Sequence, residues 1–127
     1  MLPFTPLETH ALRFICEAGV QLTAAQREAL WTLLNTASLV ERENTGHGFY
    51  TAFQVDRTLG SPLGDVSMIN GPSVALVGHG EGNRMDFILW AEGGFPSTLE
   101  GFQHGDLAGE TVDLRQVDLA ALQFQPT

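Results

Sequence analysis

The feature that most constrains the fold is a change of hydrophobic period near Ser38. Before Ser38, apolar side chains recur every three or four residues, as on one face of an amphipathic helix. After Ser38, apolar and polar residues alternate, as in a strand with one buried face. Because the two periods suit different elements, the chain must join N-terminal helices to a sheet. This order predicts an α+β fold.

The first predicted helix has a well-defined start and end. Thr5 and Glu8 form a capping-box pattern, in which each side chain satisfies a free backbone N–H, and Pro6 suits the first helical position. Apolar residues then follow at helical spacing as far as Gly19, a suitable C-terminal cap. The sequence therefore predicts a helix that begins after Thr5 and ends near Gly19.

A second helix follows after a short linker, Val20–Leu22. Thr23 and Gln26 repeat the capping-box pattern. The apolar face of this helix comprises Leu30, Trp31, Leu33 and Leu34. Because so short a linker leaves little reach, we expect the two helices to pack as neighbours on one face of the sheet.

The sheet is expected to be mostly antiparallel, with about five strands joined by turns. Its strands are predicted at Leu39–Asn44, Phe49–Val55, Val74–His79, Arg84–Ala91 and Ser97–Gln103. The segment Arg57–Pro72 holds three glycines and two prolines and is interpreted as a long loop, with a short strand at Val66–Ile69. Val112–Leu122 fits a strand or a helical turn.

A chain of 127 residues suits one domain, 1–127. Fifteen acids outnumber six bases, all of them arginine, so the net charge is −9. This balance argues against binding to a nucleic-acid backbone or an anionic membrane. The acids concentrate in the second half of the chain. They indicate either a solvated surface or an acidic face that steers toward a basic protein partner.

The single cysteine, Cys16, permits no intramolecular disulfide and favours a reducing compartment. Met1–Pro6 lacks the basic region of a signal peptide. The apolar runs are shorter than the roughly 20 residues that a membrane span needs. We therefore expect a cytoplasmic protein without a membrane association, and we expect Cys16 to be a buried, unreactive thiol.

The absence of lysine excludes a phosphate-loop lysine, a Schiff-base lysine and a Ser-Lys dyad. No histidine pair has the spacing of a helical zinc site, and one cysteine cannot supply a zinc ribbon. These exclusions favour a protein without a cofactor, and a binding protein over an enzyme.

Three histidines share glycine neighbours: His47, His79 and His104. Glycine allows the backbone to approach a ligand closely. If the turns gather at one end of the sheet, these histidines and Glu100 supply the ligand types of a metal or acid–base site. The alternative is that each histidine is simply a turn residue.

Several aromatic and acidic residues occupy strand positions opposite the main apolar face. The aromatic residues are Tyr50, Trp90 and Phe102, and the acids are Asp86 and Glu100. If both helices cover the other face, these aromatics form a binding surface or an oligomer interface. Burial in a single core is the alternative for the aromatics. For the two acids, the alternatives are a solvent-facing position and a carboxylate that lines a pocket.

Two stretches carry a resemblance to known proteins: Thr45–Phe53, which contains Gly48-Phe49-Tyr50-Thr51 and Phe53, and Leu99–Gly105, which begins Leu99-Glu100-Gly101-Phe102. The chain resembles uncharacterised small bacterial α+β proteins in which strands of this kind follow a helical pair. In its acidity and size it is also loosely similar to immunity proteins of bacterial toxin systems. That resemblance implies a protein partner.

Two functional hypotheses result. The first is a non-catalytic acidic protein-binding domain, immunity-like, that engages a basic partner through Tyr50, Trp90, Glu100 and Phe102, with His47, His79 and His104 nearby. The second is a small-molecule or metal site, with or without catalysis, formed by the three histidines and Glu100. A homo-oligomeric role is a further alternative.

Overall fold

The computed structural model describes residues 4–18, 21–44, 48–60, 62–76, 84–104 and 124–126. Helices α1 (Pro6–Ala18) and α2 (Ala24–Leu34) come first, followed by strands and one short 3₁₀ helix, η1 (Arg57–Leu59). The strands are β1 (Ser38–Asn44), β2 (Gly48–Gln54), β3 (Met68–Leu76), β4 (Arg84–Glu92), β5 (Phe95–His104) and β6 (Phe124–Pro126). The predicted α+β fold is confirmed.

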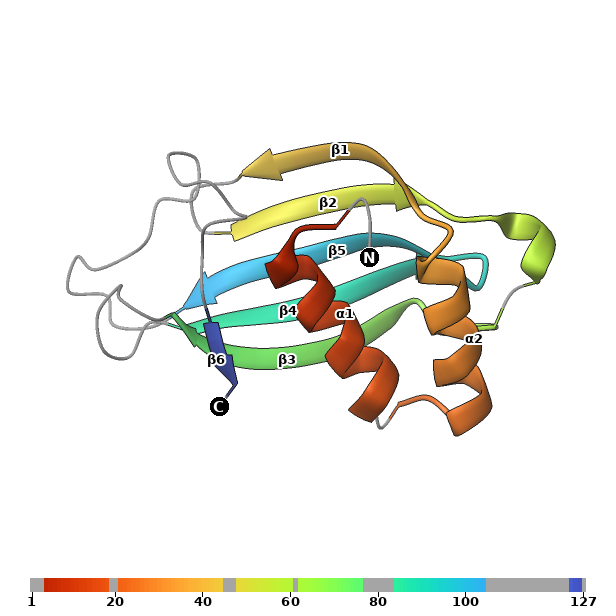
Figure 1. The fold of residues 1–127 in the computed structure, drawn as a ribbon, viewed down its shortest axis with the longest axis horizontal. Helices are drawn as coiled ribbons and strands as arrows, with labels where there is room; N and C mark the ends of the chain where they lie inside the picture. The colour runs from red at the N-terminus through yellow and green to blue at the C-terminus, as the bar shows by residue number, and fades with distance from the viewer. Residues whose placement is uncertain are drawn as a thin grey trace.

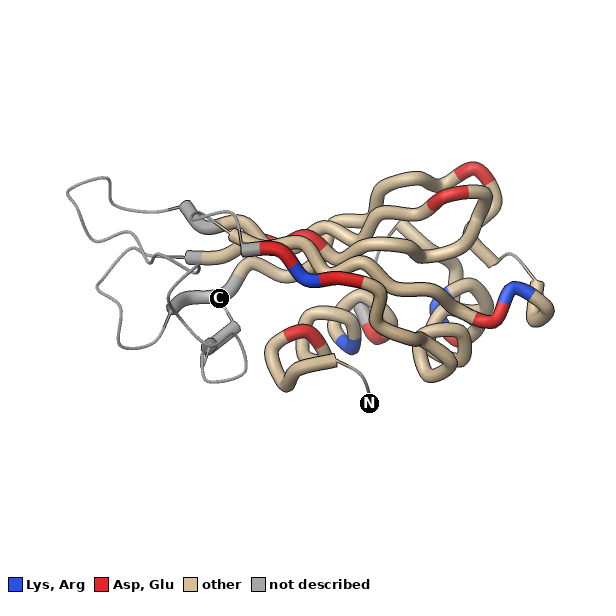
Figure 2. Tube along the Cα trace, turned by 90° about the horizontal axis from the view of Figure 1, so that it is seen from above, with Lys and Arg blue, Asp and Glu red and all other residues tan. Residues whose placement is uncertain are grey.

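The described strands form one sheet in the order β1-β2-β5-β4-β3-β6, and every neighbouring pair is antiparallel. Both helices lie on the same side of this sheet (Figures 1 and 2). The apolar core fills the space between the two layers and includes Leu12, Ile15, Leu30, Leu34, Phe49, Phe87 and Leu99. The result is a two-layer molecule in which one face of the sheet is covered by helices.

Both predicted capping boxes are present. The backbone N–H of Thr5 donates to Glu8 Oε1 at 2.8 Å, and the N–H of Glu8 donates to Thr5 Oγ1 at 3.1 Å. Thr23 and Gln26 make the same reciprocal pair at 2.8 and 3.1 Å. The predicted cap Gly19 lies outside the described residues. The two helix starts are therefore local properties of the sequence.

The alternation of side chains across the sheet agrees with the predicted faces. Phe49, Thr51 and Phe53 are buried toward the helices, whereas Tyr50 points to the other side and is exposed. In β4, the odd-numbered residues Met85–Ala91 are buried and the even-numbered ones are partly or fully exposed. We call the helix-free side of the sheet the open face. Its described side chains include Tyr50, Ala52, Asp86, Ile88, Trp90, Thr98, Glu100 and Phe102.

The segment around Gly71 differs from its prediction. Val66–Ile69 and Val74–His79 were expected as two strands, but Met68–Leu76 forms the single strand β3. Its register with β4 shifts between Asn70 and Ser73. This irregularity explains how the strand accommodates Pro72, which has no N–H to donate to the ladder. The remainder of the predicted Val74–His79 strand lies outside the described residues.

Two further elements were not predicted. The 3₁₀ helix η1 lies in the Arg57–Pro72 segment and begins at Asp56, whose carboxylate accepts from the N–H of Thr58 at 3.0 Å. Strand β6 pairs with β3 at the end of the chain. Val112–Leu122, left open between strand and helix, lies outside the described residues.

Candidate functional site

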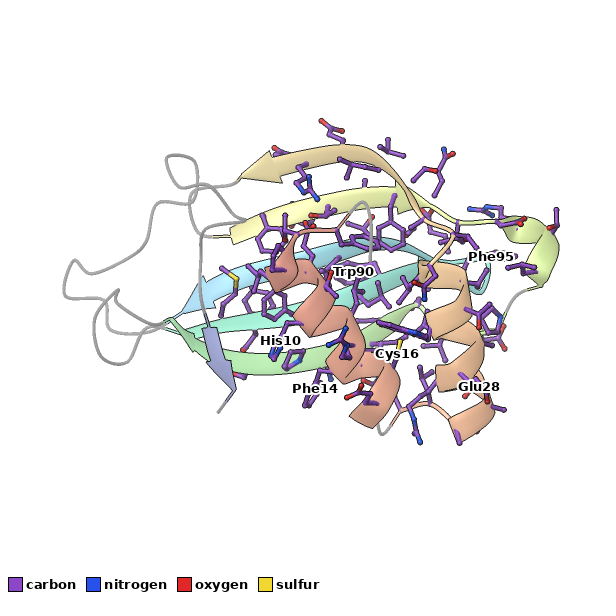
Figure 3. The ribbon with its side chains drawn as sticks, viewed as in Figure 1. His10, Phe14, Cys16, Glu28, Trp90 and Phe95 are labelled. Atoms are coloured by element: carbon purple, nitrogen blue, oxygen red, sulfur yellow. The ribbon has the colours of Figure 1, made fainter. Side chains whose placement is uncertain are left out.

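Three neighbouring strands bring the predicted aromatic residues together on the open face. Tyr50 of β2 lies directly opposite Glu100 of β5, and Glu100 lies opposite Ile88 of β4. Trp90 is two positions from Ile88 on the same face, opposite Thr98. Trp90 comes from the sheet layer, behind the helices in the view of Figure 3. The sheet register therefore surrounds one carboxylate with aromatic side chains.

Glu100 interacts with both of its aromatic neighbours. Trp90 Nε1–H donates to Glu100 Oε1 at 2.9 Å. The negative charge of Glu100 raises the pKa of Tyr50 above its usual 10.0, and a hydrogen bond between the two side chains raises it further. Tyr50 is 41% exposed and Trp90 is 37% exposed. We call Tyr50, Glu100 and Trp90 the aromatic–carboxylate cluster.

The chemistry of this cluster suits a cation. A carboxylate has about four lone-pair directions, so two donors leave acceptor capacity on Glu100. The faces of tyrosine and tryptophan attract ammonium and guanidinium groups. A charge-assisted bond to the carboxylate then adds direction. An arginine or lysine side chain of another protein fits these properties.

Phe102 and Asp86 extend the cluster along the same face. They are directly opposite each other on β5 and β4, and both are partly exposed. All four predicted binding residues with a described side chain, Tyr50, Trp90, Glu100 and Phe102, thus share one face. Asp86 adds a second carboxylate beside an aromatic ring.

Strand β1 adds further acids to the open face. Glu41 pairs with Ala52 and Glu43 pairs with Tyr50, so both acids share the face of those partners. The charge of Glu43 also contributes to the raised pKa of Tyr50, after the effects of Glu100 and of burial. The open face therefore combines aromatic residues with carboxylates from three of its strands.

The described arginine side chains are engaged elsewhere. Arg13 lies over the Trp31 ring at 5.9 Å, and Arg57 lies over the Phe95 ring at 4.9 Å. Arg27 donates to the Leu22 carbonyl at 2.9 Å, and Arg42 binds Glu8 at 2.7 Å. Arg84 stands at the start of β4, and its side chain is outside the described set. Acids thus predominate among the charged side chains described on the open face.

A shallow hollow adjoins the cluster. It is lined by Tyr50, Ser67, Trp90, Ala91, Glu92, Ser97 and Thr98. The Ser97 hydroxyl donates to the Trp90 carbonyl at 3.3 Å and so helps to hold this end of β4. A larger hollow lies between α2 and η1, lined by Ala25, Glu28, Ala29, Thr32, Leu33, Leu59, Gly60 and Pro62. Its lining contains none of the predicted binding residues, so we place the candidate site on the open face.

The predicted histidine site remains a prediction. His47 and His79 lie outside the described residues, and His104 is described only through its backbone, opposite Arg84. Within the part of the chain that the structure describes, no three His, Cys, Asp or Glu residues are grouped so as to hold a metal ion. Glu100, the fourth predicted member, belongs to the aromatic–carboxylate cluster.

A buried polar group that the sequence analysis missed lies on the helix side of the sheet. Glu8, predicted only as a cap, is fully buried and accepts from Arg42 Nη2 at 2.7 Å and from Arg42 Nε at 3.0 Å. The hydroxyl of Thr51, also fully buried, donates to the same carboxylate. The sequence contains one indication of this group, because the polar residue Thr51 stands between two buried phenylalanines on the same face of β2.

Burial alone would raise the pKa of Glu8, but its hydrogen bonds from Arg42, Thr51 and Thr5, with the charge of Arg42, outweigh burial. The pKa of Glu8 therefore lies below its usual 4.5. A carboxylate held by so many donors is stabilised as the anion. This group ties α1 to β1 and β2, and we assign it a structural role.

Cys16 is half-buried on α1 (Figure 3). Burial, followed by the nearby charge of Glu17, raises the pKa of its thiol to about 12. The group is therefore a neutral thiol near pH 7, which suits packing and not nucleophilic chemistry.

Comparisons of the chain with protein-family models, with curated proteins and with solved structures found no match. The fold and the site therefore define only a class of protein. It is an α+β domain in which helices cover one face of the sheet and the open face carries aromatic and acidic side chains. Neither described helix is long and apolar enough to cross a membrane.

Proposed function

We propose that this protein is a non-catalytic binding domain whose open face engages a basic protein partner. The observation that carries the proposal is the aromatic–carboxylate cluster, in which Trp90 hydrogen-bonds to Glu100, Tyr50 lies directly opposite Glu100, and both aromatic side chains remain exposed. The loose similarity to toxin-immunity proteins agrees with such a role and suggests a toxin domain as the partner.

The composition of the cluster supports an anchoring role. Tryptophan and tyrosine are enriched among the few interface residues that dominate binding energy. Trp90 is already oriented by its hydrogen bond to Glu100, so a partner need not order this side chain on binding. Trp90 therefore offers contact area at a low entropic cost.

The net charge supports rapid encounter with a basic surface. At −9, the chain attracts positively charged partners and repels acidic ones. Exposed acids on the open face, such as Glu41 and Glu43, lie near the cluster in the sheet and direct this attraction. We therefore expect the association rate to fall as ionic strength rises.

The experiment compares capture of partners by the native chain and by variants of the cluster. The bait is used in a lysate of the source organism at low salt, and each captured protein is then purified and titrated by calorimetry. Trp90→Phe removes the indole donor but keeps a ring, and Trp90→Ala removes the anchor. We expect Trp90→Ala to weaken a stoichiometric complex by about thirtyfold or more, as at an interface hot spot.

The matched control is Trp31→Ala. Trp31 lies on α2 and is the other of the two tryptophans in the chain. Circular dichroism verifies that each variant is folded. Equal affinity of Trp90→Ala and the native chain for every purified partner would reject the aromatic–carboxylate cluster as the anchor of the complex. If the native chain instead binds a second copy of itself as tightly as it binds any captured partner, the result supports a homo-oligomer.

A further inference from the structure

The far edge of the sheet is formed by strand β1. In the strand order β1 is terminal, and among the described residues it pairs with β2 alone. Such a strand presents a row of backbone N–H and C=O groups that can pair with another extended chain. Figure 1 shows β1 along the upper edge of the sheet, away from both helices for most of its length.

Part of β1 is regular enough to serve as a template. Its register with β2 shifts between Leu39 and Glu41, and Val40 is 58% exposed there. From Glu41 to Asn44 the pairing is regular. A bulge of this kind protects an edge locally, so the regular half of β1 is the part open to pairing.

The side chains of this half are sorted by face. Glu41 and Glu43 lie on the open face, whereas Arg42 reaches the helix face and holds Glu8. The ion pair fixes β1 against α1, so the edge is preorganised. A strand added here would place every second residue beside Glu41 and Glu43, where opposite charge stabilises the pair.

A second copy of the chain fits this edge poorly. In a continuous antiparallel sheet, residues that face each other lie on the same side. Pairing two β1 strands through their regular halves therefore places Glu41 opposite Glu41 or Glu43 of the other copy. Like charges directly opposite each other are destabilising.

We propose that the basic partner docks by adding an extended strand to β1, with lysine or arginine at alternate positions facing Glu41 and Glu43. This mode of recognition is β-augmentation, in which main-chain bonds give affinity and alternate side chains give specificity. It rests on the proposed function and names how the partner is held. The added strand continues the sheet, so its basic residues share the open face with the aromatic–carboxylate cluster.

The probe is a capped seven-residue peptide that alternates lysine and valine, and the control peptide alternates glutamate and valine. Amide hydrogen exchange of the native chain is followed by NMR with each peptide in excess. At ten times its dissociation constant, the lysine peptide should slow exchange of the outward amides of Glu41–Asn44 about tenfold. The glutamate peptide should leave these amides unchanged.

A matched pair of variants tests the charge requirement. Glu41→Lys with Glu43→Lys should abolish the protection. Glu17→Lys with Glu28→Lys changes the net charge equally at exposed helix positions and should preserve it. Both helix acids lie outside the open face, so the comparison separates local pairing from general attraction.

The outcomes separate this inference from the proposed function. Shifts of Trp90 and Tyr50 signals without protection of β1, or no change at either place, would overturn strand addition. Protection that grows with protein concentration in the absence of peptide would also overturn it in favour of a second copy. If β1 is protected while Trp90→Ala leaves partner affinity intact, strand addition stands and the cluster is not the anchor.

Discussion

Replacing Arg42 with methionine tests the structural role of the buried carboxylate. The change removes two donors, at 2.7 and 3.0 Å, from Glu8, a side chain that is fully buried. Removing one partner of a buried ion pair costs about 3–5 kcal/mol. The Arg42 side chain is 28% exposed, so water can approach the vacated position. We therefore expect a loss near the lower limit, about 3 kcal/mol at pH 7.

The loss should depend on pH with a defined sign. In the native chain the pKa of Glu8 is below 4.5, so its pairing stabilises the fold above that pH and is lost as pH falls through the folded pKa. In Arg42→Met, burial remains while the strongest donor is gone, so the pKa of Glu8 should rise above 4.5. Protonation of Glu8 then removes the unpaired buried charge from the variant and so reduces its loss of stability. The difference in unfolding free energy should shrink as pH falls from 7 to 4.

Urea unfolding followed by circular dichroism at the two pH values measures this difference. The control is Arg13→Met, which removes an exposed contact with Trp31 and should cost about 1 kcal/mol or less. Glu8→Gln combined with Arg42→Met removes the buried charge as well and should recover part of the loss. A loss under about 1 kcal/mol, or one equal at both pH values, would refute the reasoning.

Three further predictions concern other parts of the structure. Glu100→Gln should lower the pKa of Tyr50 toward 10.0, and the absorbance of phenolate reports it directly because Tyr50 is the single tyrosine. An unchanged titration would contradict the cluster. Gly48→Ala should destabilise the fold by about 2 kcal/mol or more, because a Cβ there would lie 2.1 Å from the Gly101 carbonyl oxygen; an unaltered melting temperature would reject that contact. Cys16, with a pKa of about 12, should react slowly with a thiol reagent at pH 8 and rapidly in urea, and rapid native reaction would contradict its burial.

Local chemistry made much of the fold predictable. The reciprocal bonds of Thr5 with Glu8 and of Thr23 with Gln26 involve residues three positions apart, so they can be inferred without tertiary structure. The alternation in β2 likewise assigns its buried side before any partner strand is known. These patterns sufficed for the α+β class.

Prediction was wrong where a non-local partner decided the outcome. Gly71 and Pro72 suggested an interruption, yet the ladder with β4 carries β3 through them as one irregular strand. The second role of Glu8 was missed because its partners, Arg42 and Thr51, are distant in sequence and meet it only when β1 and β2 pack under α1.

The candidate site divides in the same way. The sequence by itself determined that Tyr50, Trp90, Glu100 and Phe102 lie on the side of their strands opposite the main apolar residues, since side-chain direction follows from the backbone period. Only the tertiary structure decided that β2, β5 and β4 are neighbours in a register that brings Tyr50 and Trp90 to the same carboxylate. Strand order and register are set by the packing of the whole core against α1 and α2, so no local pattern contains them.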